Sequence, residues 1–299
     1  MPLRVLCEPK RVKYALIQEH EGQFCISLMC RALEVSRSGF YRWKARPQSA
    51  RQVRREAMKE QVADTWSNFK ARYGAPRITE ELNALNTPCS RNYVAELLRI
   101  QGLKARNGKR FTYGGHPLTM NNVFENLLWR DFSSQRPNQK WTTDITYIWV
   151  DKQWMYLATV MDLYSRTIVG WALDKHMTEQ LVISAAQMAF DRRGDSQGLI
   201  IHSDRGVQYR SRNYIDFIRR HGAKPSMSRK GNCWDNAPME SFFSRLKVEL
   251  IYAEKFETVQ QIKSAVLEYI DVFYNRLRRH SALGYVSPAQ FERNAALAA

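Results

Sequence analysis

Three carboxylates stand in motifs that set them apart from the other acidic residues of the chain. Asp144 lies in Trp-Thr-Thr-Asp-Ile-Thr-Tyr, Asp204 in His-Ser-Asp-Arg-Gly, and Glu240 in Trp-Asp-Asn-Ala-Pro-Met-Glu-Ser. If the fold brings them together, bound cations must relieve their repulsion, and an oxygen-only set of ligands suits hard divalent ions. Because no histidine or cysteine joins the set, Mg²⁺ or Mn²⁺ is favoured over zinc. Two such ions would support phosphoryl transfer without a protein nucleophile.

Two of these carboxylates are predicted to lie on strands. Alternating polar and apolar residues over 141–150 predict a half-buried strand that carries Asp144 on one face. The apolar run within 198–204 predicts a second strand, with Asp204 at its carboxyl end, where ligands bind in open α/β sheets. Asp144 and Asp204 are therefore expected to face one site.

The third carboxylate, Glu240, is predicted to lie in the first turn of a helix. Pro238 is tolerated only near a helix start, and Asp235 and Asn236 are candidate caps. The positive end of the helix dipole should help to keep Glu240 ionised.

The expected roles of two further residues of this helix, Lys247 and Glu249, follow from their angular positions around the helix axis relative to Glu240. Lys247 follows Glu240 by seven residues, shares its face, and is a candidate contact for a DNA phosphate. Glu249 lies about 180° around the helix from Glu240 and should be structural.

The order of the remaining elements predicts an α/β fold. Three antiparallel strands followed by alternating helices and strands is the order of a ribonuclease-H-like catalytic core, here with helical units before and after it. The expected strands are 141–150, 154–163, 166–173, 198–204 and 223–228, and the expected helices are 178–192, 211–221, 238–252 and 257–277.

A helix, a tight turn and a second helix are predicted over 26–46. Ser36 is the expected N-cap of the second helix, and Phe40 and Trp43 should pack inward. This is a helix-turn-helix pattern, and its outward basic residues are candidate DNA contacts. They are Arg37, Arg42, Lys44 and Arg46.

A second unit of this kind begins at Tyr73. It has a helix from about Thr79 and another helix capped by Ser90, which presents Arg91 to DNA. Helix pairs with basic faces are also found as solvated bundles, so both interpretations stay open for either unit.

Breaker and polar residues between roughly 105 and 140 predict a linker before the core. The expected domains are two helix-turn-helix-like units at 1–57 and 58–125, an integrase-like core at 126–252, and a helical extension at 253–299.

The charge of the chain points to a polyanionic partner. Its 299 residues include 46 basic and 29 acidic side chains, a formal net charge of +17, and residues 1–125 carry +11 of it. Double-stranded DNA is the expected partner, although a basic composition alone also suits a solvated, ribosomal or membrane-surface protein.

Five scattered cysteines form no CxxC pair, so neither structural zinc nor a disulfide framework is expected. Without a membrane-span or signal pattern, the protein is expected in the cytoplasm, associated with the nucleoid.

These motifs together resemble the catalytic, OrfB-type product of the insertion-sequence transposases of the IS-three family. The core of that product is similar to retroviral integrases. Asp144, Asp204 and Glu240, with 35 residues between the last two, match the Asp-Asp-Glu pattern of that family, and Lys247 matches its usual basic residue. Matches extend over nearly the whole chain, including Val35-Ser-Arg-Ser-Gly-Phe-Tyr, Tyr73-Gly-Ala-Pro-Arg-Ile, Asp162-Leu-Tyr-Ser-Arg and Tyr274-Asn-Arg-Leu-Arg-Arg-His.

The resemblance implies a DDE-type transposase that uses two Mg²⁺ or Mn²⁺ ions. Such an enzyme cleaves element ends with water, and the 3′-hydroxyl then attacks another phosphodiester. In this family one end attacks the other, and a circle forms before insertion into a target. A homo-oligomer on the DNA is expected. A companion product of an upstream frame usually adds a leucine zipper, and since no sustained heptad repeat occurs here, this chain is expected to lack that half.

Other interpretations compete at several positions. Asp162 also follows an apolar strand, although its place before a turn suits local backbone bonding. The motif from His202 to Arg205 fits tyrosine recombinases, with Arg166 and Tyr274 as partners, but it stands at a strand end rather than in a helical domain. His202 is either a site-lining or a structural histidine. An inactive DNA-binding repressor and a structure-selective nuclease are the alternative functions.

Two groups near these motifs also allow more than one role. The side chains of five tryptophans are expected in the core or on a hairpin face rather than as base-stacking platforms. They are Trp141, Trp149, Trp154, Trp171 and Trp234. Arg278 and His280, after the last long helix, are expected to contact phosphate, or else they favour the helix C-terminus.

Overall fold

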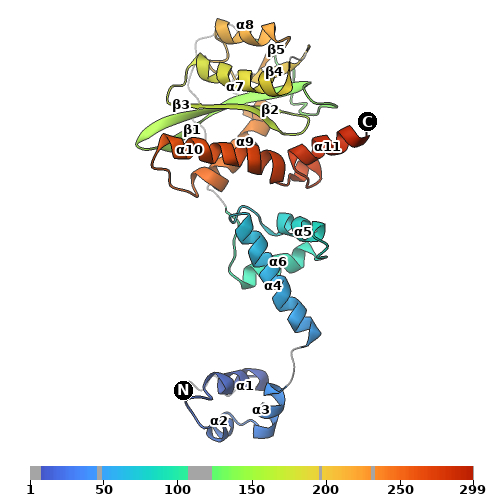
Figure 1. The fold of residues 1–299 in the computed structure, drawn as a ribbon, viewed down its shortest axis with the longest axis vertical. Helices are drawn as coiled ribbons and strands as arrows, with labels where there is room; N and C mark the ends of the chain where they lie inside the picture. The colour runs from blue at the N-terminus through green and yellow to red at the C-terminus, as the bar shows by residue number, and fades with distance from the viewer. Residues whose placement is uncertain (1–7, 46–48, 107–122, 195–196, 230–232, 299) are drawn as a thin grey trace. The chain divides into compact units, whose positions relative to one another are not determined.

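The computed structural model describes residues 8–45, 49–106, 123–194, 197–229 and 233–298 (Figure 1). By its internal contacts the chain divides into two compact units, Met1–Val62 and Ala63–Ala299. The domain boundary expected at residue 125 falls inside the second unit. In the described ranges, no helix is long and apolar enough to cross a membrane.

The described residues of the first unit include α1 (Lys10–Glu19), α2 (Ile26–Ala32), α3 (Arg37–Lys44) and the beginning of α4 (Ala50–Asn68). The core shared by α1, α2 and α3 includes Ile17 and Phe40, both closed to solvent. Ser36 caps α3 by accepting a hydrogen bond from the Gly39 N–H at 2.9 Å, as predicted. Phe40 and Trp43 both contact the ring of Tyr14, so these two residues lie on the inner side of α3, as predicted.

The second unit begins with the end of α4 (Ala50–Asn68), followed by α5 (Ala75–Ala84) and α6 (Arg91–Ile100). The helix expected from about Thr79 starts earlier, at the residue before Pro76, because proline is tolerated in a first helical turn. Ser90 caps α6 through the Tyr93 N–H at 3.3 Å, as predicted.

Among the described residues, five strands form one mixed sheet in the order β3-β2-β1-β4-β5. They are β1 (Lys140–Val150), β2 (Gln153–Asp162), β3 (Ile168–Asp174), β4 (Ile200–Ser203) and β5 (Lys224–Met227). β2 pairs antiparallel with both β1 and β3, whereas β4 pairs parallel with β1 and with β5. This is the predicted ribonuclease-H-like order, with β1 in the centre.

Helices cover both faces of the sheet (Figure 1). α7 (Glu179–Arg193) and α8 (Arg212–Arg220) lie on one face, and α9 (Ala237–Leu246) and α10 (Val259–Leu267) lie on the other. β3 and α7 approach so closely that a Cβ on Gly170 would come within 2.1 Å of the Ala185 carbonyl oxygen. A glycine is therefore required at this contact, which fixes α7 against the sheet.

The two long helices predicted at 238–252 and 257–277 both change to π-helical geometry. α9 continues into η3 (Lys247–Ile251), α10 continues into η4 (Glu268–Leu277), and α11 (Pro288–Ala298) follows. A π-helical turn contains more residues than an α-helical one, so it turns the following side chains away from their α-helical directions. Lys247 and Glu249 both lie in such a turn.

Polar contacts fasten α5 to the segment that follows η4. Arg279 donates to both carboxylate oxygens of Glu81, at 2.6 and 3.0 Å. The backbone N–H of Arg279 donates to the buried Tyr73 hydroxyl at 2.9 Å, and Arg77 donates to the Arg279 carbonyl at 2.9 Å. The second helical unit and the C-terminal segment therefore pack as one body.

Candidate active site

β1 and β4 bring Asp144 and Asp204 to the same edge of the sheet. The parallel register pairs Thr142 with His202, and a step of two residues along each chain leads to Asp144 and Asp204. Neighbouring strands lie about 4.8 Å apart, so the two carboxylates start from adjacent positions. The register agrees with the predicted shared site.

Hydrogen bonds hold the loop that carries Asp204. The Gly206 N–H donates to Asp204 Oδ1 at 2.8 Å, and a Cβ on Gly206 would come within 2.9 Å of that oxygen. Further along the loop, the buried Tyr209 hydroxyl lies 3.1 Å from Thr143 Oγ1, beside Asp144. The loop is thus bonded to β1, which limits how far the two carboxylates can separate.

Asn236 ties the start of α9 to β1. Its Oδ1 accepts a hydrogen bond from Thr142 Oγ1, and its Nδ2 donates to the Thr143 carbonyl at 3.4 Å. Glu240 follows Asn236 by four residues, about one helical turn, so it lies on the same side of α9. Asn236 therefore directs Glu240 toward Asp144.

Burial and neighbouring negative charges raise the pKa values of the carboxylates in this site. Burial first, and the negative charge of Asp204 next, raise the pKa of Asp144 well above its ordinary value, and the charge of Glu240 adds to this. Burial also raises the pKa of Asp204 and of Glu240. The helix dipole was expected to keep Glu240 ionised, but its loss of water has the larger effect.

This set of donors fits hard divalent cations. All of the donor atoms are carboxylate oxygens, and a cation would relieve the repulsion that raises the pKa of Asp144. Within the part of the chain that the structure describes, no three acidic, histidine or cysteine side chains converge on one point. The carboxylates are neighbours rather than a closed cage, so their side chains must move inward to bind an ion together.

We expect the Asp144→Asn protein to melt at a higher temperature than the wild-type protein when divalent ions are removed. The folded-state pKa of Asp144 is raised, so the stability that its neutral form supplies is present below about pH 4 and is lost as the pH rises through the folded-state pKa. The amide stays neutral throughout, so its advantage should grow as the pH rises through the folded-state pKa of Asp144. Calorimetry in EDTA measures this difference, and an equal or lower melting temperature at pH 8 would contradict it.

Lys247 lies near enough to Asp144 for the charges of the two side chains to interact. Its side chain is buried; loss of water lowers its pKa, and the charge of Asp144 acts in the opposite direction. The site therefore contains a positive charge as well as negative ones. The contact of Lys247 with a DNA phosphate stays a prediction.

Asp235 is not the helix cap that its position suggests. It is fully buried and accepts hydrogen bonds from Asn126, Arg130 and Arg229 at 2.9 to 3.1 Å. These bonds, chiefly those from Arg229, hold its pKa far below the ordinary value. Asp235 anchors the segment that leads into α9 and so supports the position of Glu240.

Arg278 and His280 are structural rather than exposed DNA contacts. Arg278 is 4% exposed and donates to both oxygens of Glu249 at 2.8 and 3.0 Å. His280 is buried, and burial lowers its pKa to about 3, so it is neutral at physiological pH. The expectation of phosphate contacts is corrected for both residues, whereas the structural role predicted for Glu249 agrees with its ion pair.

The other basic candidates differ in their surroundings. Arg37, Arg42 and Arg91 are exposed on their helices and stay candidate DNA contacts. Lys44 forms an ion pair with Glu21 at 2.6 Å. A DNA phosphate would have to compete with the Glu21 carboxylate for the Lys44 ammonium group. Arg46 lies outside the described residues.

Asp162 and His202 both have structural partners. Asp162 is buried and accepts a hydrogen bond from the Tyr164 N–H at 3.0 Å, which is the turn role that was favoured for it. His202 lies between the hydroxyls of Ser226 and Ser228, at 2.8 and 3.1 Å, and burial lowers its pKa to about 4. Of the two roles left open for His202, the structural one agrees with these contacts.

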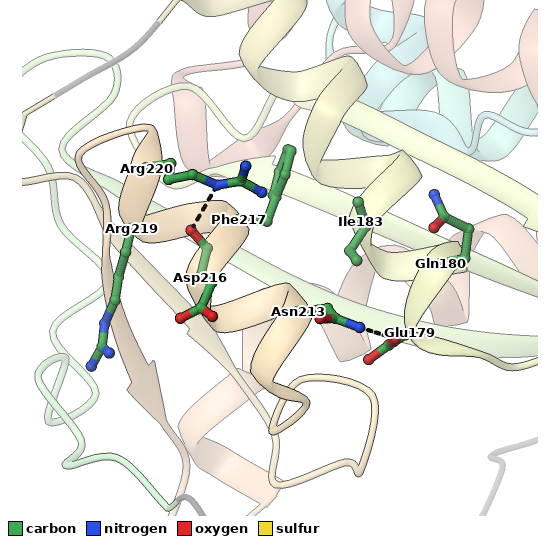
Figure 2. Close-up of a pocket in the computed structure, with 8 residues that line it drawn as sticks. All are labelled: Glu179, Gln180, Ile183, Asn213, Asp216, Phe217, Arg219 and Arg220. Carbon is green, nitrogen blue, oxygen red and sulfur yellow. Dashed lines mark hydrogen bonds between the residues drawn. The ribbon is translucent and has the colours of Figure 1, made fainter.

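A shallow hollow of about 840 Å³ between α7 and α8 has no part in this site (Figure 2). Side chains of both signs line it, and hydrogen bonds engage several of them. Asn213 donates to Glu179 at 2.6 Å, and Arg220 donates to the Asp216 carbonyl at 3.3 Å. None of the three carboxylates lines the hollow, so we assign it no chemical role.

Two residues that organise the site were not predicted to do so. Asn236 was considered only as a helix cap, although its spacing of four residues from Glu240 is a usable signal. The role of Tyr209 has no such signal, because it depends on how the loop after β4 returns to β1.

Comparison with protein-family models gives three matches. Residues 134–233 and 240–296 match two models of an integrase core domain, and residues 53–111 match an HTH-like domain. The first core match includes Asp144 and Asp204, and the second begins at Glu240. The order of the matches agrees with the predicted order of a helical DNA-binding unit and a catalytic core.

Two bacterial proteins are similar to this chain over almost their whole length. Transposase InsF for insertion sequence IS3A of Escherichia coli K12 is 46% identical over 286 residues, which cover 94% of this chain and 98% of that protein. The uncharacterized 31 kDa protein of insertion element IS600 from Shigella sonnei is 39% identical over 266 residues, 88% of this chain and 97% of that protein. Among solved structures, the HTLV-2 integrase catalytic core domain in complex with magnesium is 19% identical, with a TM-score of 0.42, over 53% of this chain and 98% of that one.

Proposed function

Because this chain belongs to the IS3 family of insertion-sequence transposases and has their integrase core, we propose that it cleaves element ends and joins the resulting 3′-hydroxyl to another phosphodiester. As a DDE-type DNA transposase it is a polynucleotidyl transferase. One observation carries the proposed assignment of the site: the β1 to β4 register sets Asp144 beside Asp204, with Glu240 near enough for its charge to act on Asp144.

Asp144, Asp204 and Glu240 are the residues that would hold two divalent ions. When bound, such ions would favour ionisation of the attacking hydroxyl or water and stabilise the leaving oxygen. The raised pKa of Asp144 supports this role, since the carboxylates are crowded in a way that added positive charge relieves. Asn236 and Tyr209 would act as positioning residues, because each is bonded to β1 beside Asp144.

Each chemical step exchanges one phosphorus–oxygen bond for another. In cleavage a water oxygen attacks the phosphorus and the bond to the 3′ oxygen breaks, so that oxygen takes a proton and becomes a hydroxyl. In joining, the oxygen of this hydroxyl loses its proton and attacks a second phosphorus, and the bond from that phosphorus to a second 3′ oxygen breaks, so that oxygen takes up a proton. Lys247, beside Asp144, would offset the negative charge of the phosphate during both steps.

The N-terminal helical part of the chain would bind part of the DNA. The exposed Arg37, Arg42 and Arg91 supply charge for phosphate contacts that do not depend on sequence. Joining two ends to a target requires several sites at once, so we propose a homo-oligomer on DNA, assisted by a companion upstream-frame product. Its place of action would be the nucleoid in the cytoplasm.

The test is a joining assay with the full chain and a labelled duplex that carries a terminal repeat of its own element. In Mg²⁺ we expect a strand with a new 3′-hydroxyl and a longer, joined strand, and EDTA should remove both products. Binding without products would instead identify a repressor. Cutting of branched or hybrid DNA without joining would identify a nuclease, and either result would overturn the proposal.

A further inference from the structure

Lys247 lies in the π-helical turn η3, which continues α9. Its side chain is 7% exposed, and its charge interacts with that of Asp144. The Tyr252 N–H donates to the Lys247 carbonyl at 2.8 Å, a bond that spans five residues as in a π-helix. Turns of this kind are rare and are found mostly at functional sites. The direction of the Lys247 side chain therefore depends on what holds this turn in place.

Glu249, two residues after Lys247, is 2% exposed, and its backbone carbonyl lies at the end of the turn. In a continued α- or π-helix, this carbonyl would accept a hydrogen bond from the N–H of Ala253 or of Glu254. Both of these N–H groups donate to the Leu250 carbonyl instead, at 3.1 and 3.2 Å. A buried carbonyl without a donor is costly, so the end of this turn requires a donor from another segment.

Arg106, in the segment that follows α6, is that donor. Its guanidinium Nη1 donates to the Glu249 carbonyl at 2.7 Å, across 143 residues of sequence. The Arg106 backbone is itself fixed, because its N–H donates to the Ala71 carbonyl at 2.9 Å. The Trp66 indole also donates to the Lys104 carbonyl at 3.1 Å, so α4 and the segment after α6 are bonded to each other. The second helical unit thus holds the backbone of η3.

The bond from Arg106 differs from the other contacts of Glu249 in the group that it engages. Arg278 and Tyr269 bind the Glu249 carboxylate, whereas Arg106 binds the backbone of the turn. A hydrogen bond with a charged donor is about twice as strong as a neutral one. Lys247 reaches the site on a flexible four-carbon stem, so a small rotation of the turn would displace its ammonium group. A misplacement of about 1 Å in a catalytic site can cost about a hundredfold in rate.

We propose that Arg106 is a positioning residue, which holds the π-helical turn through the Glu249 carbonyl and so directs Lys247 toward the DNA phosphate. The proposal rests on the proposed function for the role of Lys247. It gives the second helical unit a part in the chemical step, in addition to the DNA contact expected of Arg91.

The test is a double-mutant cycle on the full-length protein, with Arg106→Met, Lys247→Met and the two substitutions combined. Single-turnover cleavage of the labelled element end in Mg²⁺ measures the rate. We expect Arg106→Met to slow cleavage about tenfold when Lys247 is present, and by at most about twofold when Lys247 is already methionine. A residue that acts through Lys247 has no ammonium group to position in the second background, whereas general damage to the fold would slow both backgrounds equally.

Glu254→Gln is the matched control for Arg106→Met. It removes the 4.0 Å ion pair of Arg106 with Glu254 and leaves the bond to the Glu249 carbonyl, so its cleavage rate should equal that of wild type. The proposal is overturned if Arg106→Met cleaves as wild type does, or if its loss is the same in both Lys247 backgrounds.

Amide hydrogen exchange in EDTA tests the same contact without any cleavage. We expect the backbone of residues 247–254 to exchange roughly tenfold faster in Arg106→Met than in wild type, with β1 and the Glu254→Gln protein unchanged. Wild-type exchange over 247–254 in Arg106→Met would overturn the proposal. If the wild-type protein cleaves no DNA, the proposed function fails, and the exchange rates still decide whether Arg106 holds the turn.

Discussion

The variants Asp144→Asn, Asp204→Asn and Glu240→Gln are each expected to lose DNA cleavage and joining by about a thousandfold or more while keeping their affinity for DNA. Each amide preserves the shape of the side chain but removes the negative charge that a divalent ion requires. A thousandfold loss corresponds to about 4 kcal/mol of transition-state stabilisation, which is in the range expected of such ions. Single-turnover cleavage of a labelled element end measures the rate, and binding without divalent ions measures the affinity.

Asp151→Asn is the matched control for these variants. Asp151 is exposed in the β1–β2 turn with a φ of 48°, a conformation that asparagine also adopts readily. Its cleavage rate should equal that of wild type. Wild-type cleavage by any one of the three amide variants would refute the role of that carboxylate.

The Glu249→Gln protein is expected to lose about 3–5 kcal/mol of its free energy of unfolding. Glu249 is 2% exposed and accepts hydrogen bonds from Arg278 and, at 2.9 Å, from the Tyr269 hydroxyl. Removing its charge leaves the Arg278 guanidinium buried without a counter-charge, and this is the costly way to break a buried ion pair. Urea unfolding followed by tryptophan fluorescence measures the change.

The effect of Glu249 should also depend on pH. Burial favours its neutral form, but the hydrogen bonds and charge of Arg278 outweigh burial and lower its pKa. The advantage of the wild-type protein is therefore present above about pH 4.3 and is lost as the pH falls through the lowered folded-state pKa. Glu254→Gln is the control, since Glu254 is a third exposed and 4.0 Å from Arg106, and it should cost at most about 1 kcal/mol. Equal stability of the two variants would contradict the role of Glu249.

Local sequence patterns were sufficient for the sheet and for the caps of α3 and α6. Alternation over 141–150 predicted β1 to within one residue, and the turn after 150 predicted where β2 begins. Ser36 and Ser90 were predicted as caps because a cap bonds a backbone N–H only three residues away. In each case the interaction that sets the structure is itself local.

Roles set by distant segments could not be predicted in this way. Asp235 was expected to cap a helix, but besides Arg229, six residues before it, its partners are Asn126 and Arg130, which are far from it in sequence. The burial of Arg278 and His280 likewise depends on packing that no neighbouring residue reveals. The Asp-Asp-Glu trio was an exception, because the motifs around it resemble a known family over most of the chain.

The contacts of Arg279 with Glu81 and Tyr73 also bear on how such chains can exchange parts during evolution. A crossover between two relatives in the stretch between 105 and 140 would take α5 from one parent and its partner segment from the other. In the hybrid, the polar side chains of α5 and of the segment after η4 would then not match, even if each parental half folds well by itself. An exchange that preserves function should therefore transfer residues 63–299 as one piece. Substitutions on one side of this interface should be accompanied by substitutions on the other side.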